Sequence, residues 1–177
     1  MSYTTSQLDF AVAFLRSHPE TRLVTLDIGA NDLFVLENLE CRANTGCIAA
    51  GLPAVLQMVG KNLTTIYGRI RGEAAYRGHI VALTYYATDY RDQTTVQALG
   101  ALNATIAAAT LAADGKVADG SGAFRLIAGF AGGDACRAGL LIVTGRSPLT
   151  CDIHPSPFGR EVLATAIQLA LLTSPDP

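Results

Sequence analysis

An amide side chain placed directly after an apolar run is the first feature of this chain with chemical potential. Asn31 follows Gly29, which closes the run formed by residues 23–28. Such a run predicts a buried strand, and sites in open α/β sheets lie beyond the carboxyl ends of the strands. An amide held there can donate a hydrogen bond to an oxyanion. The alternative is an ordinary turn, because Gly-x-Asn-Asp sequences often follow strands.

An imidazole late in the chain is the second such feature. His154 stands after Asp152 and before Pro155, ahead of a helix start. Imidazole titrates near neutral pH and can take a proton from a hydroxyl group. Asp152 is placed to orient the ring and to stabilise its charged form. The alternatives are a plain His-Pro turn for His154, and a solvated turn residue or helix-capping charge for Asp152.

Taken together and in this order, the two segments resemble motifs of the SGNH (GDSL-like) hydrolases, a family of esterases and lipases. Residues 29–32 resemble the G-x-N-D block of that family, and residues 152–155 resemble its closing block. Residues 80–86 are similar to the next parallel strand of its secreted esterases. The resemblance implies that Asn31 is an oxyanion-hole donor and that His154 is the general base.

The resemblance further implies hydrolysis of short- to medium-chain acyl esters without a cofactor. The substrate pocket is expected around Gly29, Leu33, Tyr85 and Phe158, and the apolar residues among these suit an acyl group. For Tyr85 the alternative is a core or rim aromatic residue.

Two departures from the family pattern bear on activity. The G-D-S block that carries the family's nucleophile is absent, and the spacing D-x-H replaces the usual D-x-x-H before His154. Ser121, between two glycines, is a weak substitute because the family's serine precedes the position of Asn31. The sequence therefore resembles the C-terminal part of such an enzyme. The alternative function is an inactive SGNH-like remnant or a ligand-binding domain.

Composition limits the classes of function. The 177 residues, half of them hydrophobic, predict a single domain over residues 1–177. A net charge of −2 without a basic cluster argues against nucleic-acid binding. No run reaches the roughly 20 apolar residues of a membrane span, and no phosphate-binding glycine loop is present.

The opening residues show no signal-peptide pattern. We expect a cytoplasmic protein, or a chain that starts downstream of its native N-terminus; the resemblance favours a secreted one.

Four cysteines allow three disulfide pairings. The local pairing of Cys41 with Cys47 and of Cys136 with Cys151 is favoured, and secreted relatives use similar bonds to tether loops. The alternative is four buried thiols. The cysteines lack zinc-type spacing and the three histidines lie far apart, so no metal site is predicted.

Strand and helix patterns alternate along the chain. Strands are predicted at residues 23–28, 80–86, 116–119 and 140–143, and the first should be buried on both faces. Asp27 within it is expected to be structural. Helices are predicted from Leu8 to Pro19 and at residues 53–75, 96–113 and 156–172, with a polar excursion at 37–46 and an unassigned glycine-rich segment at 120–148.

This alternation predicts a mainly parallel sheet with helices on both faces. The resemblance implies a flavodoxin-like three-layer α/β/α sandwich in which the nucleophile strand lies next to residues 23–28. If that strand is missing, Leu23 to Ile28 forms an exposed apolar edge, which proteins usually cover or pair. We therefore expect a homo-oligomer formed through this edge, or collapse of the edge onto the N-terminal helix.

Overall fold

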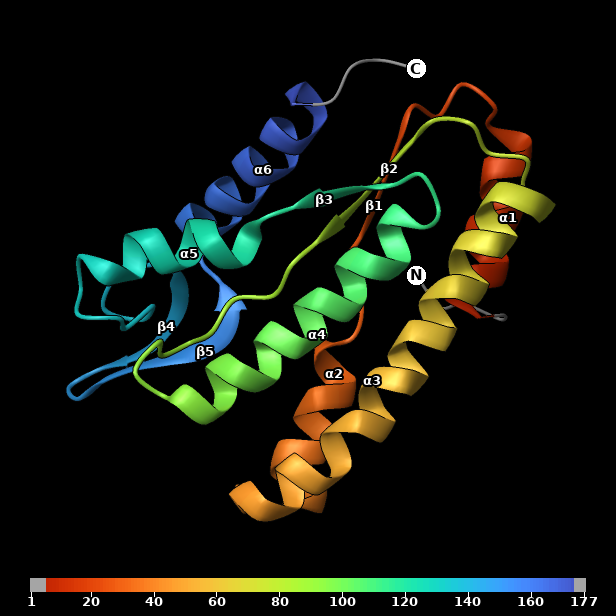
Figure 1. The fold of residues 1–177 in the computed structure, drawn as a ribbon. Helices are drawn as coiled ribbons and strands as arrows, with labels where there is room; N and C mark the ends of the chain where they lie inside the picture. The colour runs from red at the N-terminus through yellow and green to blue at the C-terminus, as the bar shows by residue number, and fades with distance from the viewer. Residues whose placement is uncertain (1–5, 174–177) are drawn as a thin grey trace.

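The computed structural model describes residues 6–173, which adopt a mixed α/β fold (Figure 1). Residues 1–5, where no signal-peptide pattern was found, lie outside this part. The helices are α1 (Gln7–Ser17), α2 (Ala30–Phe34), α3 (Thr45–Gly68), α4 (Gln93–Leu111), α5 (Gly120–Gly129) and α6 (Pro157–Leu172), with π-helical segments η1 (Val35–Glu40) and η2 (Arg69–Glu73). The strands are β1 (Leu23–Leu26), β2 (His79–Leu83), β3 (Lys116–Ala118), β4 (Leu141–Arg146) and β5 (Leu149–Pro155).

The main sheet is parallel and has the order β1-β2-β3, so β2 is its central strand. Alternate side chains of a strand point to opposite faces. Ile80 and Ala82 of β2 therefore join a core formed with α1, α3 and α4, while Val81 and Leu83 join a second core formed with α5 and α6. The expected parallel sheet is confirmed, although it has only three strands in the described part.

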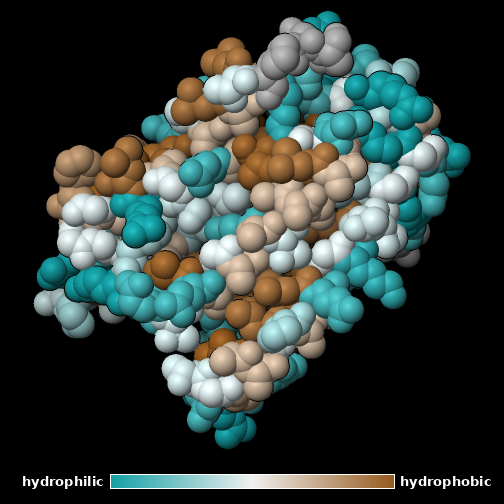
Figure 2. All heavy atoms as spheres, in the orientation of Figure 1, coloured by the Kyte–Doolittle hydropathy of each residue, from teal (hydrophilic) through white to brown (hydrophobic). Residues whose placement is uncertain are grey.

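The strands β4 and β5 form a separate antiparallel hairpin. This hairpin and α5 occupy much of the glycine-rich segment that the sequence left unassigned. Between α5 and α6 lies an apolar groove of about 560 Å³. Hydrophobic side chains are exposed on these two helices, among them Leu126 and Leu169, and Figure 2 shows brown spheres in this region.

Strand β1 is covered on one face only. Val24 and Leu26 pack in the first core, but Leu23 is 39% exposed and Thr25 is exposed too. The prediction of a strand buried on both faces is therefore wrong. The physical reason is that α6 packs against β2 and β3, which leaves this face of β1 uncovered. In the described part no strand pairs with the outer edge of β1.

The helical segments before β2 also differ from expectation. Helix α3 begins at Thr45 instead of residue 53, because the Asn44 side chain caps it by accepting the Cys47 N–H at 2.9 Å. The polar segment 37–46 is largely helical, because η1 continues directly from α2. Gly51 permits this packing: a Cβ at that position would lie 2.5 Å from Leu36 in η1. In the described part no helix is long and apolar enough to cross a membrane.

Glu37 in η1 supports a prediction about stability. Its Oε1 atom is buried and has no hydrogen-bond partner within the described residues. Burial, with the nearby Asp92 carboxylate, raises the pKa of Glu37. The fold therefore favours the protonated form, and this stabilisation is lost as pH rises through the folded-state pKa. We expect Glu37→Gln to raise the free energy of unfolding at pH 7 by about 1 kcal/mol, or the Tm by roughly 2–4 °C.

Circular-dichroism melts of wild type and variant between pH 4 and pH 8 measure this effect. The difference in Tm should shrink toward pH 4, where the wild-type carboxyl is also neutral. Glu40→Gln, an exposed position in the same segment, is the matched control. An equal gain in both variants, or a gain at every pH, would contradict the assignment to burial of Glu37.

Candidate functional site

Two consecutive tyrosines mark the carboxyl end of the central strand β2. Tyr85 packs against the first core, and Tyr86 packs against the second. The Tyr86 hydroxyl donates to the Ile153 carbonyl at 2.9 Å, and its ring stacks on Phe124 with centroids 4.0 Å apart. The carboxyl end of the sheet is therefore linked to strand β5, which carries His154.

Asn31 lies in the first turn of α2, directly beyond the end of β1. The turn is fixed by Gly29, which is buried and has φ +121°. A Cβ at Gly29 would be strained at that φ and would lie 3.1 Å from Leu102 and 3.3 Å from Val59. Because the turn cannot change easily, Asn31 is held at the edge of the sheet, where it is exposed.

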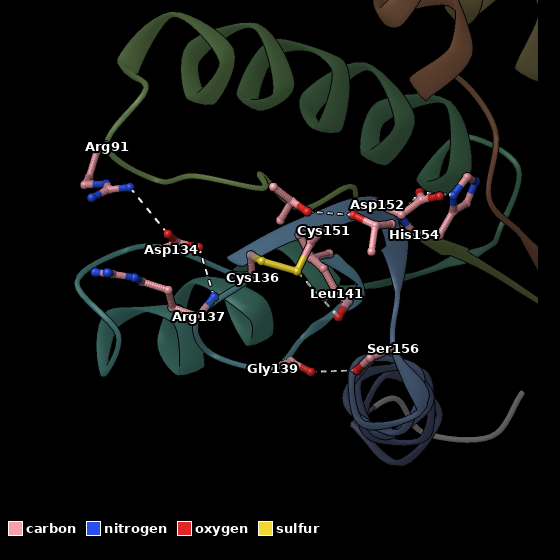
Figure 3. The surroundings of a disulfide bond; sticks show 12 residues. Arg91, Asp134, Cys136, Arg137, Gly139, Leu141, Cys151, Asp152, His154 and Ser156 are labelled. Atoms are coloured by element: carbon pink, nitrogen blue, oxygen red, sulfur yellow. Dashed lines mark hydrogen bonds and ion pairs between the residues drawn. A yellow bond between two sulfur atoms is a disulfide. The ribbon is translucent and has the colours of Figure 1, made fainter. Parts of the chain in front are cut away.

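His154 and Asp152 form a direct pair on β5 (Figure 3). The imidazole Nδ1 lies 2.5 Å from Asp152 Oδ1, and that same oxygen accepts the His154 backbone N–H at 2.9 Å. The D-x-H spacing suits a strand, because residues two apart share one face. The backbone N–H and then the imidazole of His154 lower the pKa of Asp152, which keeps it an anion. The ring is 69% exposed, so its other nitrogen can be reached from solvent.

The backbone around this pair is tied down on both sides. Before Asp152, Cys151 is bonded to Cys136 (Figure 3). After His154, the Ser156 hydroxyl donates to the Gly139 carbonyl at 2.7 Å and accepts the Gly159 N–H at 3.0 Å, which caps α6. The second predicted disulfide, Cys41–Cys47, is also present. Both predicted pairings are confirmed, and the alternative of four thiols is not.

A cavity of about 430 Å³ lies against the hairpin and includes Asp152 and Ile153 in its wall. It is lined by charged, hydroxyl and apolar groups from the β2–α4 loop, the α5–β4 segment and the hairpin, namely Thr88, Asp89, Asp134, Cys136, Arg137, Leu141, Pro148, Leu149, Thr150, Cys151, Asp152 and Ile153. Arg91 contacts the carboxylates of Asp89 and Asp134 at 2.6 and 3.6 Å. The sequence analysis missed this cavity, because its walls come from three separate segments.

The other expected site residues lie in different settings. Leu33 is 3% exposed and belongs to the first core, while Phe158 is 46% exposed at the start of α6. Ser121 opens α5, where its N–H donates to Thr84 Oγ1 at 3.1 Å and its carbonyl accepts the Tyr90 hydroxyl at 2.9 Å. No hydrogen bond in the described part joins Ser121 or Asn31 to His154.

Within the described residues, no group of three or more histidine, cysteine or acidic side chains is placed to hold a metal ion. The arrangement offers an oriented imidazole beside a carboxylate, an amide at the same end of the sheet, and an adjacent cavity. No protein-family model matches this chain, and neither curated proteins nor solved structures give a match.

Proposed function

We propose that this chain is a carboxylic ester hydrolase of the SGNH type that acts on short- to medium-chain acyl esters. The observation that carries the proposal is the Asp152–His154 pair, with an accessible ring held on a tethered strand. The proposal includes a flavodoxin-like α/β/α sandwich. It is supported by the parallel sheet, whose central strand faces a different helical core on each side.

The geometry suggests a division of roles. With Nδ1 paired to Asp152, the Nε2 atom of His154 is left to accept a proton from an attacking hydroxyl. The Asn31 amide would donate to the oxyanion that forms when the hydroxyl oxygen bonds to the acyl carbon. Collapse of the oxyanion breaks the ester C–O bond while His154 returns the proton to the leaving alcohol. Water activated by His154 then attacks the acyl group in the same way and releases the carboxylic acid.

The proposal leaves the nucleophile unassigned. A serine supplied from outside this sequence would complete the site, and Ser121 is the weaker choice within it. Ser121 lies in the first turn of α5, just after β3, at the carboxyl end of the sheet. Its hydrogen bonds are to Thr84 and Tyr90.

A second candidate function is ligand binding without catalysis. The cavity beside Asp152 favours it, because that cavity has mixed polar and apolar walls. In the described part, no serine or cysteine is hydrogen-bonded to His154. Arg137 and the carboxylates of the wall would suit a polar small molecule better than an acyl chain.

We also propose self-association through the uncovered edge of β1, where Leu23 and Ile28 are 39% and 38% exposed. A secreted location is part of the proposal, because disulfides such as the two seen here persist in oxidising compartments.

Labelling with a fluorophosphonate probe, followed by peptide mass mapping, tests the ester hydrolase. One labelled serine in the folded protein, absent after denaturation, would identify a nucleophile within this chain, and Ser121→Ala would show whether it is Ser121. Folded protein without label would rule out a self-sufficient serine enzyme and leave a site that needs a serine from outside this sequence or the ligand-binding function.

A further inference from the structure

We infer that Tyr86 is a positioning residue that fixes the segment of β5 carrying Asp152 and His154. The catalytic meaning of this role rests on the proposed function. Its geometry rests on a hydrogen bond, a ring stack and the strand register of the described residues.

The segment that carries the pair has an irregular register against β4. One pair of the ladder joins Leu141 to Pro155, and the next joins Val143 to Cys151. Residues 152–154 therefore stand opposite a single residue of β4. Extra residues in one strand are left without ladder partners, and the strand bends there. The position of this segment thus depends on contacts from outside the hairpin.

The Tyr86 hydroxyl makes such a contact at the centre of the segment. It donates to the Ile153 carbonyl at 2.9 Å. That carbonyl and the His154 N–H belong to one peptide group, which is planar. The same N–H donates to Asp152 Oδ1 at 2.9 Å, and this oxygen lies 2.5 Å from His154 Nδ1. Fixing the peptide plane therefore fixes the direction in which its N–H holds the carboxylate beside the ring.

Tyr86 is itself held at its ring and at the backbone before it. Its ring stacks on Phe124 of α5 with centroids 4.0 Å apart, and Phe124 is fully buried. The Asn103 side chain of α4 accepts the Tyr85 N–H at 2.7 Å and donates to the Tyr85 carbonyl at 2.9 Å. A hydroxyl mounted between two helices in this way has little freedom to move, so its bond to Ile153 gives that carbonyl a fixed position.

The Tyr86 hydroxyl also stays protonated, as a donor must. Burial, followed by the Asp27 and Asp152 carboxylates, raises the pKa of Tyr86. The hydroxyl therefore keeps its proton near neutral pH, where an imidazole acts as a base. A phenylalanine at this position would keep the stack on Phe124 and would lose only the bond to the Ile153 carbonyl.

The consequence concerns the position of the His154 ring. A catalytic group displaced by about 1 Å can cost roughly 100-fold in rate. Without the bond to the Ile153 carbonyl, Asp152 and His154 keep their contact with each other but move together relative to the sheet. The pair remains a base, while its distance from a substrate changes. Tyr86 acts through this distance and not through contact with the substrate.

The test compares Tyr86→Phe with Tyr90→Phe, each of which removes one hydroxyl. The Tyr90 hydroxyl donates to the Ser121 carbonyl at 2.9 Å, so the control loses a bond of the same kind to a different element. In Tyr86→Phe we expect hydrogen exchange at the His154 amide to speed up about fivefold and the imidazole nitrogen NMR signals of His154 to shift. In Tyr90→Phe the changes should appear in α5 instead.

For ester hydrolysis, Tyr86→Phe should lower kcat about tenfold and leave KM unchanged, as expected when a transition-state contact is misplaced. Unchanged His154 signals in Tyr86→Phe, or the same shifts in both variants, would overturn the inference. An unchanged kcat despite shifted His154 signals would overturn it too. The NMR signals are read without substrate, so a wild-type protein without hydrolytic activity would count against the proposed function alone.

Discussion

Replacing His154 with alanine is expected to lower the rate of ester hydrolysis, measured with p-nitrophenyl acetate, by about 10³- to 10⁴-fold. The reason is that the His154 imidazole is paired with the Asp152 carboxylate, so its removal leaves no base beside Asp152. Stability should change by less than about 0.5 kcal/mol, since the side chain is mostly exposed. Initial rates and thermal melts of the same preparations measure both quantities.

Two further variants give this experiment its controls. His18→Ala removes an imidazole at the end of α1, where it stacks on Phe14, and should leave the rate unchanged. Asp152→Asn keeps an oxygen next to the ring but loses the negative charge, so we expect a smaller loss than in His154→Ala. If the His154 variant kept wild-type rates, or if the His18 variant lost as much, His154 would not be the base.

Removing the Cys136–Cys151 bond is the second change with a large expected effect. For the 15-residue separation of these cysteines, the double serine variant should lose about 3 kcal/mol of unfolding free energy, or roughly 6–12 °C in Tm. Activity should fall further than stability alone explains, because Cys151 directly precedes Asp152. Denaturant unfolding and initial rates, both at 15 °C where the variant stays folded, separate these effects.

The Cys41–Cys47 bond provides the matched comparison. It closes a shorter loop of separation 6, so its removal should cost about 1 kcal/mol less than removal of the other bond. It lies between η1 and α3, away from strand β5, and its loss should leave the reaction of His154 intact. Equal losses of activity in the two double variants would show that the bond next to Asp152 has no special effect on the site.

The helix that follows the candidate site illustrates what the sequence can reveal. Ser156 followed by Pro157 predicted the start of α6, and the Ser156 hydroxyl does cap that helix. The start of α5 carries a similar signal, because Asp119 accepts the Gly122 N–H at 2.8 Å. This helix start was not predicted, because glycine has a low helix propensity and the surrounding glycines favoured a loop.

The pairing of Asp152 with His154 could be predicted because both partners lie two residues apart. Their position on a strand could not, because β5 gains its hydrogen bonds from β4 across a hairpin with irregular register. The two hydrogen bonds between the Asn103 side chain and the Tyr85 backbone could not be predicted from the sequence for a similar reason. Asn103 stands 18 residues away, and only the packing of α4 beside the sheet brings its amide to Tyr85.

The two adjacent tyrosines also limit how this chain can change in length. Because neighbouring residues of an extended segment face opposite sides, one residue inserted between Leu83 and Tyr85 would turn each ring toward the wrong half of the molecule. A two-residue insertion would restore the facing but move both rings past their partners. Homologous chains should therefore keep the length of this short segment constant and vary in length instead at the tip of the β4–β5 hairpin, around Ser147 and Pro148.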